Sequence, residues 1–559
     1  MPPAADYPLR TGRAEPLGRR DILWLGALLL IALLPRAFVA CQLGPICDDG
    51  YFYLAVSEAY ERGDLDTALW YLNINIYPVL IAGFDRLGAD PLVAAQAWGV
   101  AVATLTILPL FGWLRRLLDR RVALAACGLY AIHPEFIEIS PEPIRDATFW
   151  LLAATSLYLL WRAAAERKAW LFVGAGLALA AAAHTRSEGW LLMLPATAWP
   201  LVRWRESRRD RWRLSLGTAA TFAMTPLFVL LFNVTVLRDH DRWELGKLEH
   251  FRLAARWIVG SDVVAPPAIS GSATIPPAFV GLSMIPTASA ATSNVADRSH
   301  EMPEEPLKRC TGASSYLRSA VHALEPVPLI LMLIGAVGWP HLLLRREHLV
   351  LSAICIAVLT GVWVRQVTLG EINGRYFLAC FFPASGAAGL GALWVLSRLE
   401  RGWKTFGRQR GAAIAAATTA VLIGTVHVVE AVAAEHPSRE REAAIGRHLG
   451  EQLGPDRSFL VLPHACRVGY YAGGQLPVVA LDDTPLETLL ERYQSDTVIL
   501  ENSYTPASQC EALAEHLKLC GWRTYDLGDV PDSEGFVVLT RAESIADASR
   551  LRATRRHRR

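Results

Sequence analysis

The 559-residue sequence has little charge and little cysteine. Charged residues make up 19% of it, against about 25% in an ordinary soluble protein, and nine cysteines are too few for a disulfide-stapled scaffold. The sequence contains no CxxC pair, no GxGxxG after a predicted strand and no GxxxxGK[ST] segment, which argues against a structural zinc site and the common nucleotide-binding loops. The net charge of +2 gives no reason to expect a nucleic-acid partner.

Apolar residues, in contrast, make up 52% of the chain and gather in long blocks. A helix needs about 20 mostly apolar residues to cross a bilayer. The sequence therefore predicts an α-helical polytopic membrane protein with about eleven transmembrane helices, at 22–40, 92–112, 122–140, 147–161, 169–183, 189–202, 214–236, 322–343, 348–364, 376–396 and 411–432.

The distribution of basic residues predicts the orientation of these helices. With a cytoplasmic N-terminus, the inner segments hold more than three times as many lysines and arginines as the short outer segments. An odd number of spans then places the C-terminal part outside. We therefore expect a multi-pass protein of the inner or plasma membrane.

Four parts follow from this topology: a cytoplasmic segment at 1–21, a transmembrane catalytic domain at 22–434, an extracytoplasmic α/β domain at 435–545 and a basic tail at 546–559. The transmembrane domain carries two long outer loops, 41–91 and 237–321. The α/β domain is predicted from apolar runs typical of short strands, with helical stretches between them; the strands are expected at 459–462, 478–481, 498–500 and 536–539, and the helices at 484–493 and 507–519.

Charged residues recur at the outer ends of the predicted spans, where they are costly and usually have a partner or a task. Each group also has an ordinary explanation, such as a solvated carboxylate, a surface ion pair or an arginine that reaches the interface. Their location on one face of the membrane is what favours a shared site. The groups are Asp48-Asp49, His133-Pro134-Glu135, Glu142 to Asp146, His184 to Gly189, and Glu371 to Tyr376.

Such a face suits a lipid that carries a phosphate. Arginines would bind the phosphate and stabilise it as a leaving group, and a carboxylate would take the proton of an attacking hydroxyl. The apolar grooves between spans would accept a polyprenyl chain. Without a nucleotide-binding loop, a lipid-linked sugar donor is favoured over a nucleotide sugar.

Four motifs, in order, resemble those of the GT-C glycosyltransferases. They are Ile46-Cys47-Asp48-Asp49-Gly50-Tyr51-Phe52-Tyr53-Leu54-Ala55 with Tyr77-Pro78, His133-Pro134 through Arg145-Asp146, His184-Thr185-Arg186-Ser187-Glu188-Gly189, and Gly374-Arg375-Tyr376-Phe377. The sequence is most similar to the bacterial branch related to protein O-mannosyltransferases and the lipid A aminoarabinose transferase. The resemblance covers roughly residues 20–400.

This resemblance implies a role for each group of residues. Asp49 or Asp48 would be the catalytic base, with Asp49 favoured because it lies closer to the aromatic pair, and Glu142 or Asp146 would be a second acidic residue. The donor phosphate would meet Arg375, Arg186 and Arg145, and substrate would contact Tyr51, Tyr77, His184, Glu188 and Tyr376. No cofactor is required, although Asp48 and Asp49 could hold Mg²⁺ or Mn²⁺ through hard oxygen ligands.

The predicted function is transfer of a sugar from a polyprenyl-phosphate donor in the membrane to an extracytoplasmic acceptor, which could be a glycan, a lipid or a protein. One alternative is a transporter or flippase of a lipid-linked sugar, which would usually show related halves and broken helices at the bilayer midplane. Another is a non-catalytic scaffold, which has no need of eleven spans with charged outer ends.

Overall fold

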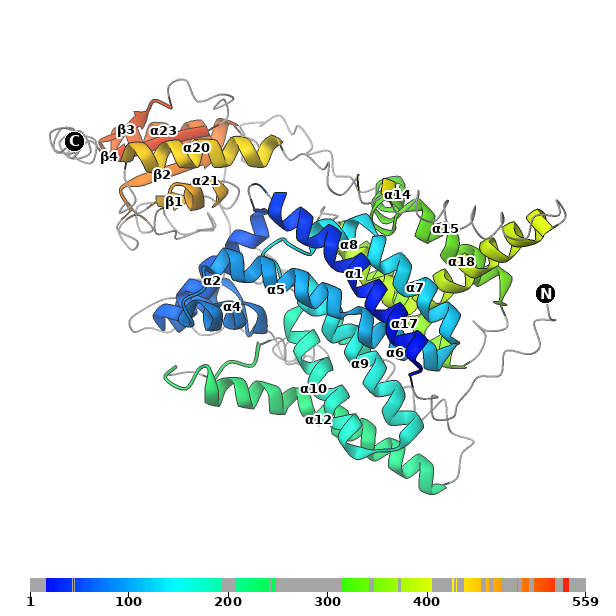
Figure 1. The fold of residues 1–559 in the computed structure, drawn as a ribbon. Coiled ribbons are helices and arrows are strands. Elements are labelled where there is room, and N and C mark those ends of the chain that lie inside the picture. The colour runs from blue at the N-terminus through cyan, green and yellow to red at the C-terminus, as the bar shows by residue number, and fades with distance from the viewer. Residues whose placement is uncertain are drawn as a thin grey trace, which may run out of the picture.

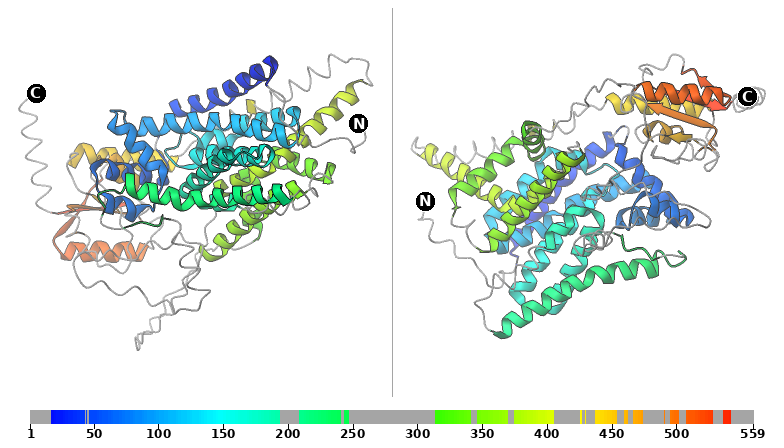
Figure 2. Two further views of the ribbon diagram at one scale, coloured as in Figure 1. Left: turned by 90° about the horizontal axis from the view of Figure 1, so that it is seen from below. Right: turned by 180° about the vertical axis from the view of Figure 1, so that it is seen from behind.

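The structure is a computed structural model that describes residues 17–42, 44, 46–193, 208–240, 243–246, 313–340, 346–369, 374–404, 425–426, 429, 437–453, 459–461, 466–473, 490, 495–501, 507–527 and 536–541. A body of packed helices is followed by a smaller unit that contains a four-stranded sheet (Figure 1). The sheet-bearing unit lies at one end of the body, beside α2 (Asp48–Arg62), as two further views confirm (Figure 2).

The helical body is built from elements drawn from most of the chain. The first half holds α1 (Arg19–Gln42), α2, α3 (Leu65–Tyr71), α4 (Ile76–Arg86), α5 (Pro91–Leu105), α6 (Ile107–Leu117), α7 (Arg120–Ile132), α8 (Pro134–Ile139), α9 (Asp146–Glu166), α10 (Ala169–Thr185) and the 3₁₀ helix η2 (Ser187–Leu192). The second half holds α12 (Arg208–Thr235), α14 (Ala313–Leu324), α15 (Pro326–Gly338), α17 (Arg346–Leu369), the 3₁₀ helix η5 (Gly374–Cys380) and α18 (Phe381–Lys404).

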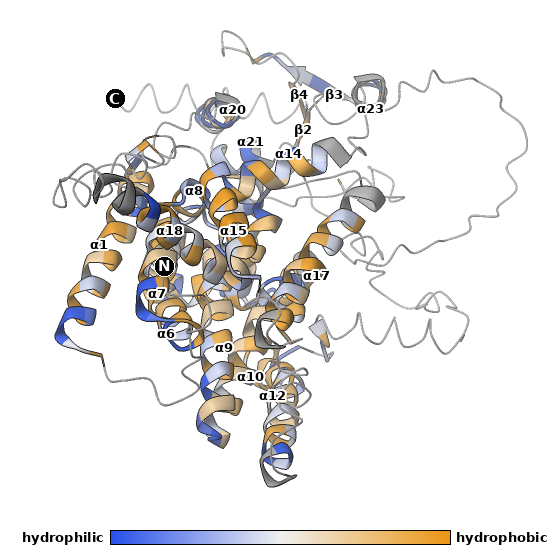
Figure 3. Ribbon diagram, turned by 90° about the vertical axis from the view of Figure 1, so that its right-hand side faces the viewer, coloured by the Kyte–Doolittle hydropathy of each residue, from blue (hydrophilic) through white to orange (hydrophobic). Residues whose placement is uncertain are grey.

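Among the described residues, four helices are long and apolar enough to cross a membrane: Arg19–Gln42, Pro91–Leu117, Arg211–Thr235 and Gly374–Arg398. A fifth is possible if Ser315–Leu324 and Pro326–Gly338, which bend by 92°, count as one span. Apolar residues cover α1, α15 and α17 in orange in Figure 3, and α1 exposes large side chains such as Trp24, Leu34 and Phe38. The chain is therefore a membrane protein by helix length and composition, while the number of eleven spans stays a prediction.

Several predicted spans have different bounds in the structure. The block predicted at 122–140 is not one helix, because α7 ends before His133 and Pro134 starts α8, as expected of a residue that cannot donate a backbone hydrogen bond. Residues 187–192 form η2 where a span was predicted from 189, and residues 194–202 of that block lie outside the described residues. The block at 411–432, most of the loop at 237–321 and the basic tail also lie outside them.

Small residues set the distance between α15 and α18. A Cβ added to Gly335 would lie 1.9 Å from the carbonyl oxygen of Ala387, and one added to Gly391 would lie 1.9 Å from that of Leu331. Only glycine permits backbones to approach this closely, as at other helix interfaces in membranes. The α18 helix carries η5 at its start, so this packing also fixes the position of η5.

The C-terminal unit is a sheet with the strand order β1-β2-β4-β3. Its strands are β1 (Phe459–Val461), β2 (Thr497–Glu501), β3 (Trp522–Tyr525) and β4 (Phe536–Arg541), and its helices are α20 (Pro437–Leu453), α21 (Cys466–Tyr471) and α23 (Ala507–Leu519). β1 and β2 are parallel, whereas β4 pairs antiparallel with both β2 and β3. The strands predicted at 459–462, 498–500 and 536–539 correspond to β1, β2 and β4, whereas β3 was not predicted. The elements predicted at 478–481 and 484–493 lie largely outside the described residues.

A buried arginine joins α1 to α7 and α8. Arg36 is fully buried and donates hydrogen bonds to the carbonyl oxygens of Ala131 (2.9 Å) and Tyr130 (3.2 Å), to that of Ala32 in its own helix (2.8 Å), and to Oγ of Ser140 (3.1 Å). Its guanidinium therefore satisfies carbonyl groups that the end of α7 leaves without helical partners.

We predict that Arg36→Ala destabilises the protein strongly. The substitution leaves several buried acceptors without a donor, each at a cost of about 1–3 kcal/mol. The apparent melting temperature in detergent should therefore fall by several degrees, whereas Arg62→Ala, which removes a surface ion pair with exposed Glu58, should change it little. Equal melting temperatures for the two variants would show that Arg36 does not hold α1 in place.

Candidate active site

The first outer segment places both aspartates at the start of a helix. Cys47 is the extended residue before α2, and Asp48 and Asp49 lie in the first turn, where the helix dipole favours negative charge. A Cβ on Gly50 would lie only 2.6 Å from Cγ of Pro143, so the start of α2 packs directly on the turn between α8 and α9. The side chain of Asp48 lies outside the described residues.

Asp49 and Arg375 form an ion pair although they lie 326 residues apart. The pair joins the start of α2 to η5. The Asp49 side chain is 42% exposed and that of Arg375 is 17% exposed. Of the predicted catalytic carboxylates whose side chains are described, Asp49 is therefore the one that is open to solvent.

Arg186 holds two buried carboxylates together. It donates to Asp146 at the start of α9 and to both oxygens of Glu188 in η2, at 2.6 and 3.3 Å. Burial by itself would raise the pKa of Glu188, but Arg186 lowers it to about 2. Burial lowers the pKa of Arg186, and the two carboxylates outweigh this and raise it above its ordinary value.

Tyr376 lies between the two arginines. The guanidinium carbon of Arg186 is 5.2 Å from the centre of the Tyr376 ring, and that of Arg375 is 5.9 Å from it. Both distances are typical of cation–π contacts. Three of the predicted binding residues thus form one continuous group with Asp49.

Arg145 belongs to the same region through an aromatic pair. Its guanidinium carbon is 5.5 Å from the centre of the Tyr53 ring, and Tyr53 meets Tyr77 edge to face at 5.4 Å. Burial raises the pKa of Tyr53 to about 12. Tyr53 was absent from the predicted site, yet it lies four residues after Asp49 and therefore on the same face of α2.

Tyr51 links α2 to the C-terminal unit. Two residues along a helix turn a side chain by roughly half a circle, so Tyr51 and Tyr53 lie on different sides of α2. The Tyr51 ring meets that of Tyr470 in the C-terminal unit edge to face, at 5.7 Å. Tyr51 therefore contacts the sheet-bearing unit, and its predicted role in substrate binding stays a prediction.

Glu142 binds the backbone at the start of α2. Its buried carboxylate accepts a hydrogen bond from the Cys47 N–H at 3.0 Å and forms an ion pair with Arg439 of α20. Burial lowers the pKa of Arg439, and Glu142 outweighs this effect and raises it. Arg439 was not among the predicted site residues, because nothing in the local sequence links α20 to Glu142, 297 residues earlier.

Two further residues of the C-terminal unit bind the backbone just before α2. Arg467 donates from Nε to the carbonyl oxygen of Ile46 at 2.9 Å, and Oη of Tyr471 accepts from the Ile46 N–H at 3.1 Å. Arg467 is itself paired with Glu442 at 2.8 Å. Side chains of α21 thus bind both the N–H and the carbonyl oxygen of Ile46, three residues before Asp49.

His184 lies in the helical core. It is fully buried, its Nδ1 is 2.9 Å from the carbonyl oxygen of Ala180, and its ring packs on Phe228 (5.0 Å) and Trp190 (6.1 Å). These contacts join α10 to α12 and η2. They support the loop that carries Arg186.

The described group contains three arginines (145, 186 and 375) and three carboxylates (49, 146 and 188). Its charges balance, and each arginine contacts an aromatic ring as well. An incoming phosphate can therefore bind an arginine by displacing the carboxylate that is paired with its guanidinium. Such an arrangement suits transfer reactions with a phosphate leaving group.

Comparison with known proteins gives a family match over part of the chain and a shared fold. Residues 76–231 match the family model described as dolichyl-phosphate-mannose-protein mannosyltransferase. The crystal structure of ArnT from Cupriavidus metallidurans bound to undecaprenyl phosphate superposes with a TM-score of 0.55 at 14% identity, over 94% of this chain and 98% of that chain. The chain has the GT-C fold.

Two further structures share this GT-C fold. ArnT from Cupriavidus metallidurans in the apo state gives a TM-score of 0.56 at 14% identity, over 95% of this chain and 99% of that chain. The apo oligosaccharyltransferase of Archaeoglobus fulgidus gives 0.53 at 14% identity, over 86% of this chain and 70% of that chain. None of the curated proteins matches the chain by sequence. The predicted GT-C fold is confirmed.

We predict that Glu188 makes the stability of this GT-C body depend on pH. Its pKa of about 2 in the folded protein lies below the ordinary value of 4.5, so its contribution is complete above that value and is lost as the pH falls towards 2. The apparent melting temperature of the wild type should fall more between pH 6 and pH 3 than that of Glu188→Gln. Glu511→Gln, an exposed change on α23, should keep the wild-type slope. Parallel slopes for all three proteins would contradict the assignment.

Proposed function

We propose that the chain is a membrane glycosyltransferase that moves a sugar from a polyprenyl-phosphate donor to an acceptor hydroxyl. The observation that carries the proposal is the ion pair between Asp49 and Arg375, set beside a second arginine and an aromatic ring. The family match and the GT-C fold support the same class of reaction. A bound undecaprenyl phosphate in the structure of ArnT supports a lipid phosphate as the donor group.

Asp49 is the proposed general base. The other candidates are occupied: Asp146 is buried and paired with Arg186, and Glu142 is buried between Arg439 and a backbone N–H. A base must reach the hydroxyl of a substrate, and the side chain of Asp49 is the exposed one of these three. Glu142 and Asp146 then act as positioning residues.

In the proposed step, the acceptor oxygen attacks the anomeric carbon of the donor sugar. The bond between that carbon and the phosphate oxygen breaks, and polyprenyl phosphate leaves with the electron pair. The proton of the acceptor hydroxyl passes to Asp49. A single displacement of this kind inverts the configuration at the anomeric carbon.

Arg375 is the proposed clamp for the phosphate. A guanidinium offers a planar fork that meets two phosphate oxygens at once. When it turns from Asp49 to the phosphate, the carboxylate loses its counter-ion and becomes a better base. Donor binding would in this way activate the base, since removal of a nearby positive charge raises the pKa of a carboxylate.

Arg186 and Arg145 complete the proposed donor site. Arg186 is fixed by two carboxylates and holds the Tyr376 ring beside Arg375. Arg145 contributes positive charge next to Tyr53. Arg186 stays with its two carboxylates and Arg145 with the Tyr53 ring, so both arginines would raise the local positive potential and position the donor without moving.

The acceptor and the membrane are proposed in general terms. The acceptor would be a glycan, lipid or protein on the outer side of the inner or plasma membrane, with the sheet-bearing unit on that side. The sugar would be a hexose or a pentose. The proposed reaction needs no metal, and a role for Asp48 and Asp49 in holding Mg²⁺ or Mn²⁺ stays a prediction. The alternative of a flippase finds no support in the matches above, which are to transferases.

We predict that Asp49→Asn lowers the rate of sugar transfer by about 10²–10⁴, because the general base is lost. The apparent melting temperature should change little, since a partly exposed ion pair contributes about 1 kcal/mol or less. Transfer of radiolabelled mannose or aminoarabinose from polyprenyl phosphate would be measured in detergent, where no vesicle exists for a transporter to act on.

Glu58→Gln is the matched control on the same helix, because Glu58 is 58% exposed and forms a surface ion pair with Arg62. It should retain the wild-type rate. Full turnover in both Asp49→Asn and Asp48→Asn would rule out an aspartate of this pair as the base.

A further inference from the structure

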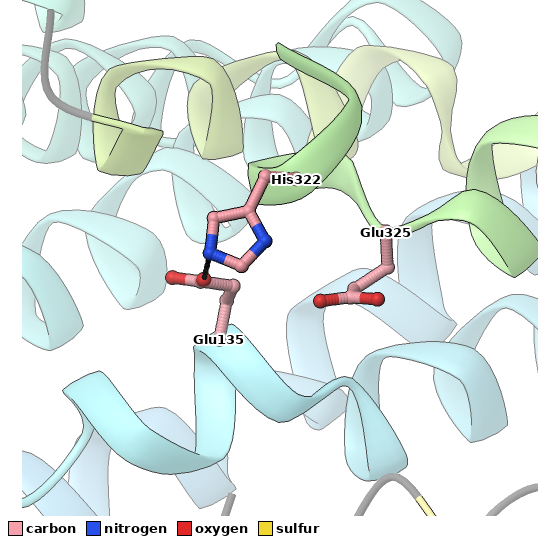
Figure 4. Close-up of side chains that lie close together, drawn as sticks. All are labelled: Glu135, His322 and Glu325. Atoms are coloured by element: carbon pink, nitrogen blue, oxygen red, sulfur yellow. Dashed lines mark ion pairs between the residues drawn. The ribbon is translucent and has the colours of Figure 1, made fainter. Parts of the chain in front are cut away.

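A second group of ligand-type side chains lies outside the proposed transfer site. Glu135 of α8, His322 of α14 and Glu325 at the bend between α14 and α15 bring one oxygen, one nitrogen and one oxygen to within 4.8 Å of one another (Figure 4). The pair of His322 Nε2 and Glu135 Oε1 is 3.9 Å apart. These residues come from two segments nearly 190 positions apart, so the fold itself assembles the group.

We propose that Glu135, His322 and Glu325 bind a divalent transition-metal ion. One imidazole and two carboxylates are ligands that Zn²⁺ accepts, with bond lengths of about 2.0–2.2 Å. Ligand atoms around such an ion lie roughly 3.4 Å apart, so the three groups need to approach one another by about 1 Å. Rotation about the side-chain bonds of the two glutamates supplies this movement.

The chemistry of the group favours a transition metal over Mg²⁺ or Ca²⁺. Those ions prefer oxygen ligands alone, whereas imidazole nitrogen suits zinc and its neighbours. Three protein ligands leave at least one coordination position for water. His322 is 77% exposed as a side chain and Glu135 19%, so an ion can enter from solvent.

Each ligand is held by a different feature of the fold. Glu135 lies in the first turn of α8, which Pro134 begins, and His322 lies in the last turn of α14. Glu325 is buried, has a φ of 61° and makes no side-chain cap to α15, which it precedes. Its side chain points instead toward Glu135 and His322 (Figure 4).

An ion at this position would hold α14, which packs on the arginine-bearing helix η5, against α8. Ala323, the residue after His322, packs closely on Gly374. A Cβ added to Gly374 would lie 3.2 Å from the Cβ of Ala323. Tyr316 of α14 meets Phe377 of η5 edge to face at 5.1 Å. The metal would therefore join α8 to α14 and support the backbone that presents Arg375. This positioning role extends the proposed function, but the metal site itself does not depend on it.

Metal binding by the purified full-length protein in detergent tests the proposal. After treatment with a chelator and dialysis, the protein would be titrated with Zn²⁺ and with Co²⁺, and bound metal would be measured by mass spectrometry and by cobalt absorption. We expect one ion per chain, and a rise of a few degrees in the apparent melting temperature when Zn²⁺ is added.

His322→Ala and Glu135→Gln should each weaken binding by at least about tenfold, because even the loss of a residue that only orients a ligand costs 10–100-fold. His322 is exposed, so its loss should leave the apo protein folded. His322→Cys should restore binding and add the absorption of a cobalt–thiolate bond. Glu138→Gln on the same helix and His516→Ala on α23 are the matched controls and should bind as the wild type does.

Three results would overturn the proposal. They are the absence of a stoichiometric ion in the wild type, equal binding by His322→Ala, and loss of the ion in Asp49→Asn with retention in His322→Ala. The last result would place the metal at the acidic pair of α2. Because the readout is bound metal, failure of the metal site and failure of the transfer mechanism are distinguishable.

Discussion

A buried guanidinium must be surrounded by acceptors, and this requirement at Arg186 organises the candidate site. Asp146 and Glu188 supply two carboxylates from different elements, so the start of α9 and the η2 turn are held together. Removal of a partner from a buried ion pair typically costs about 3–5 kcal/mol, which makes this arrangement rigid. Arg186 in turn lies against Tyr376, whose neighbour Arg375 pairs with Asp49. The buried ion pairs of Arg186 thus support the partly exposed ion pair of Asp49 and Arg375.

The segment before Asp49 is fixed from a second direction. Arg467 and Tyr471 bind both backbone groups of Ile46, and Glu142 joins the next N–H to Arg439. The sheet-bearing unit is therefore in contact with the segment that leads into the proposed base. Because these contacts use backbone groups and buried charges, a displacement of the unit would also displace the start of α2.

The sequence predicted the membrane class, the main apolar helices and the residue groups of the site, because hydropathy and local charge are properties of short segments. It also placed Asp49, Arg186 and Arg375 on one face. It could not predict which carboxylate pairs with which arginine, since the pair of Asp49 and Arg375 spans 326 residues. Tyr53 was within reach by helical spacing, whereas Arg439, Arg467 and the strand at 522–525 depend on how a distant unit packs. Pro134 indicates the helix break at His133, but the apolar residues on both sides led to the prediction of one continuous span.

We propose that Arg375 exchanges Asp49 for the donor phosphate, and the affinity for undecaprenyl phosphate without a sugar distinguishes this exchange from a permanent ion pair. Affinities would be measured for the wild type, Asp49→Asn and Arg375→Lys, with Glu58→Gln and Arg62→Lys as controls on the exposed face of α2. We expect Asp49→Asn to bind the lipid several-fold more tightly, because the competing anion is gone. Arg375→Lys should bind it about tenfold more weakly, because lysine lacks the planar fork. Equal affinity in Arg375→Lys, or weaker binding in Asp49→Asn, would contradict the exchange.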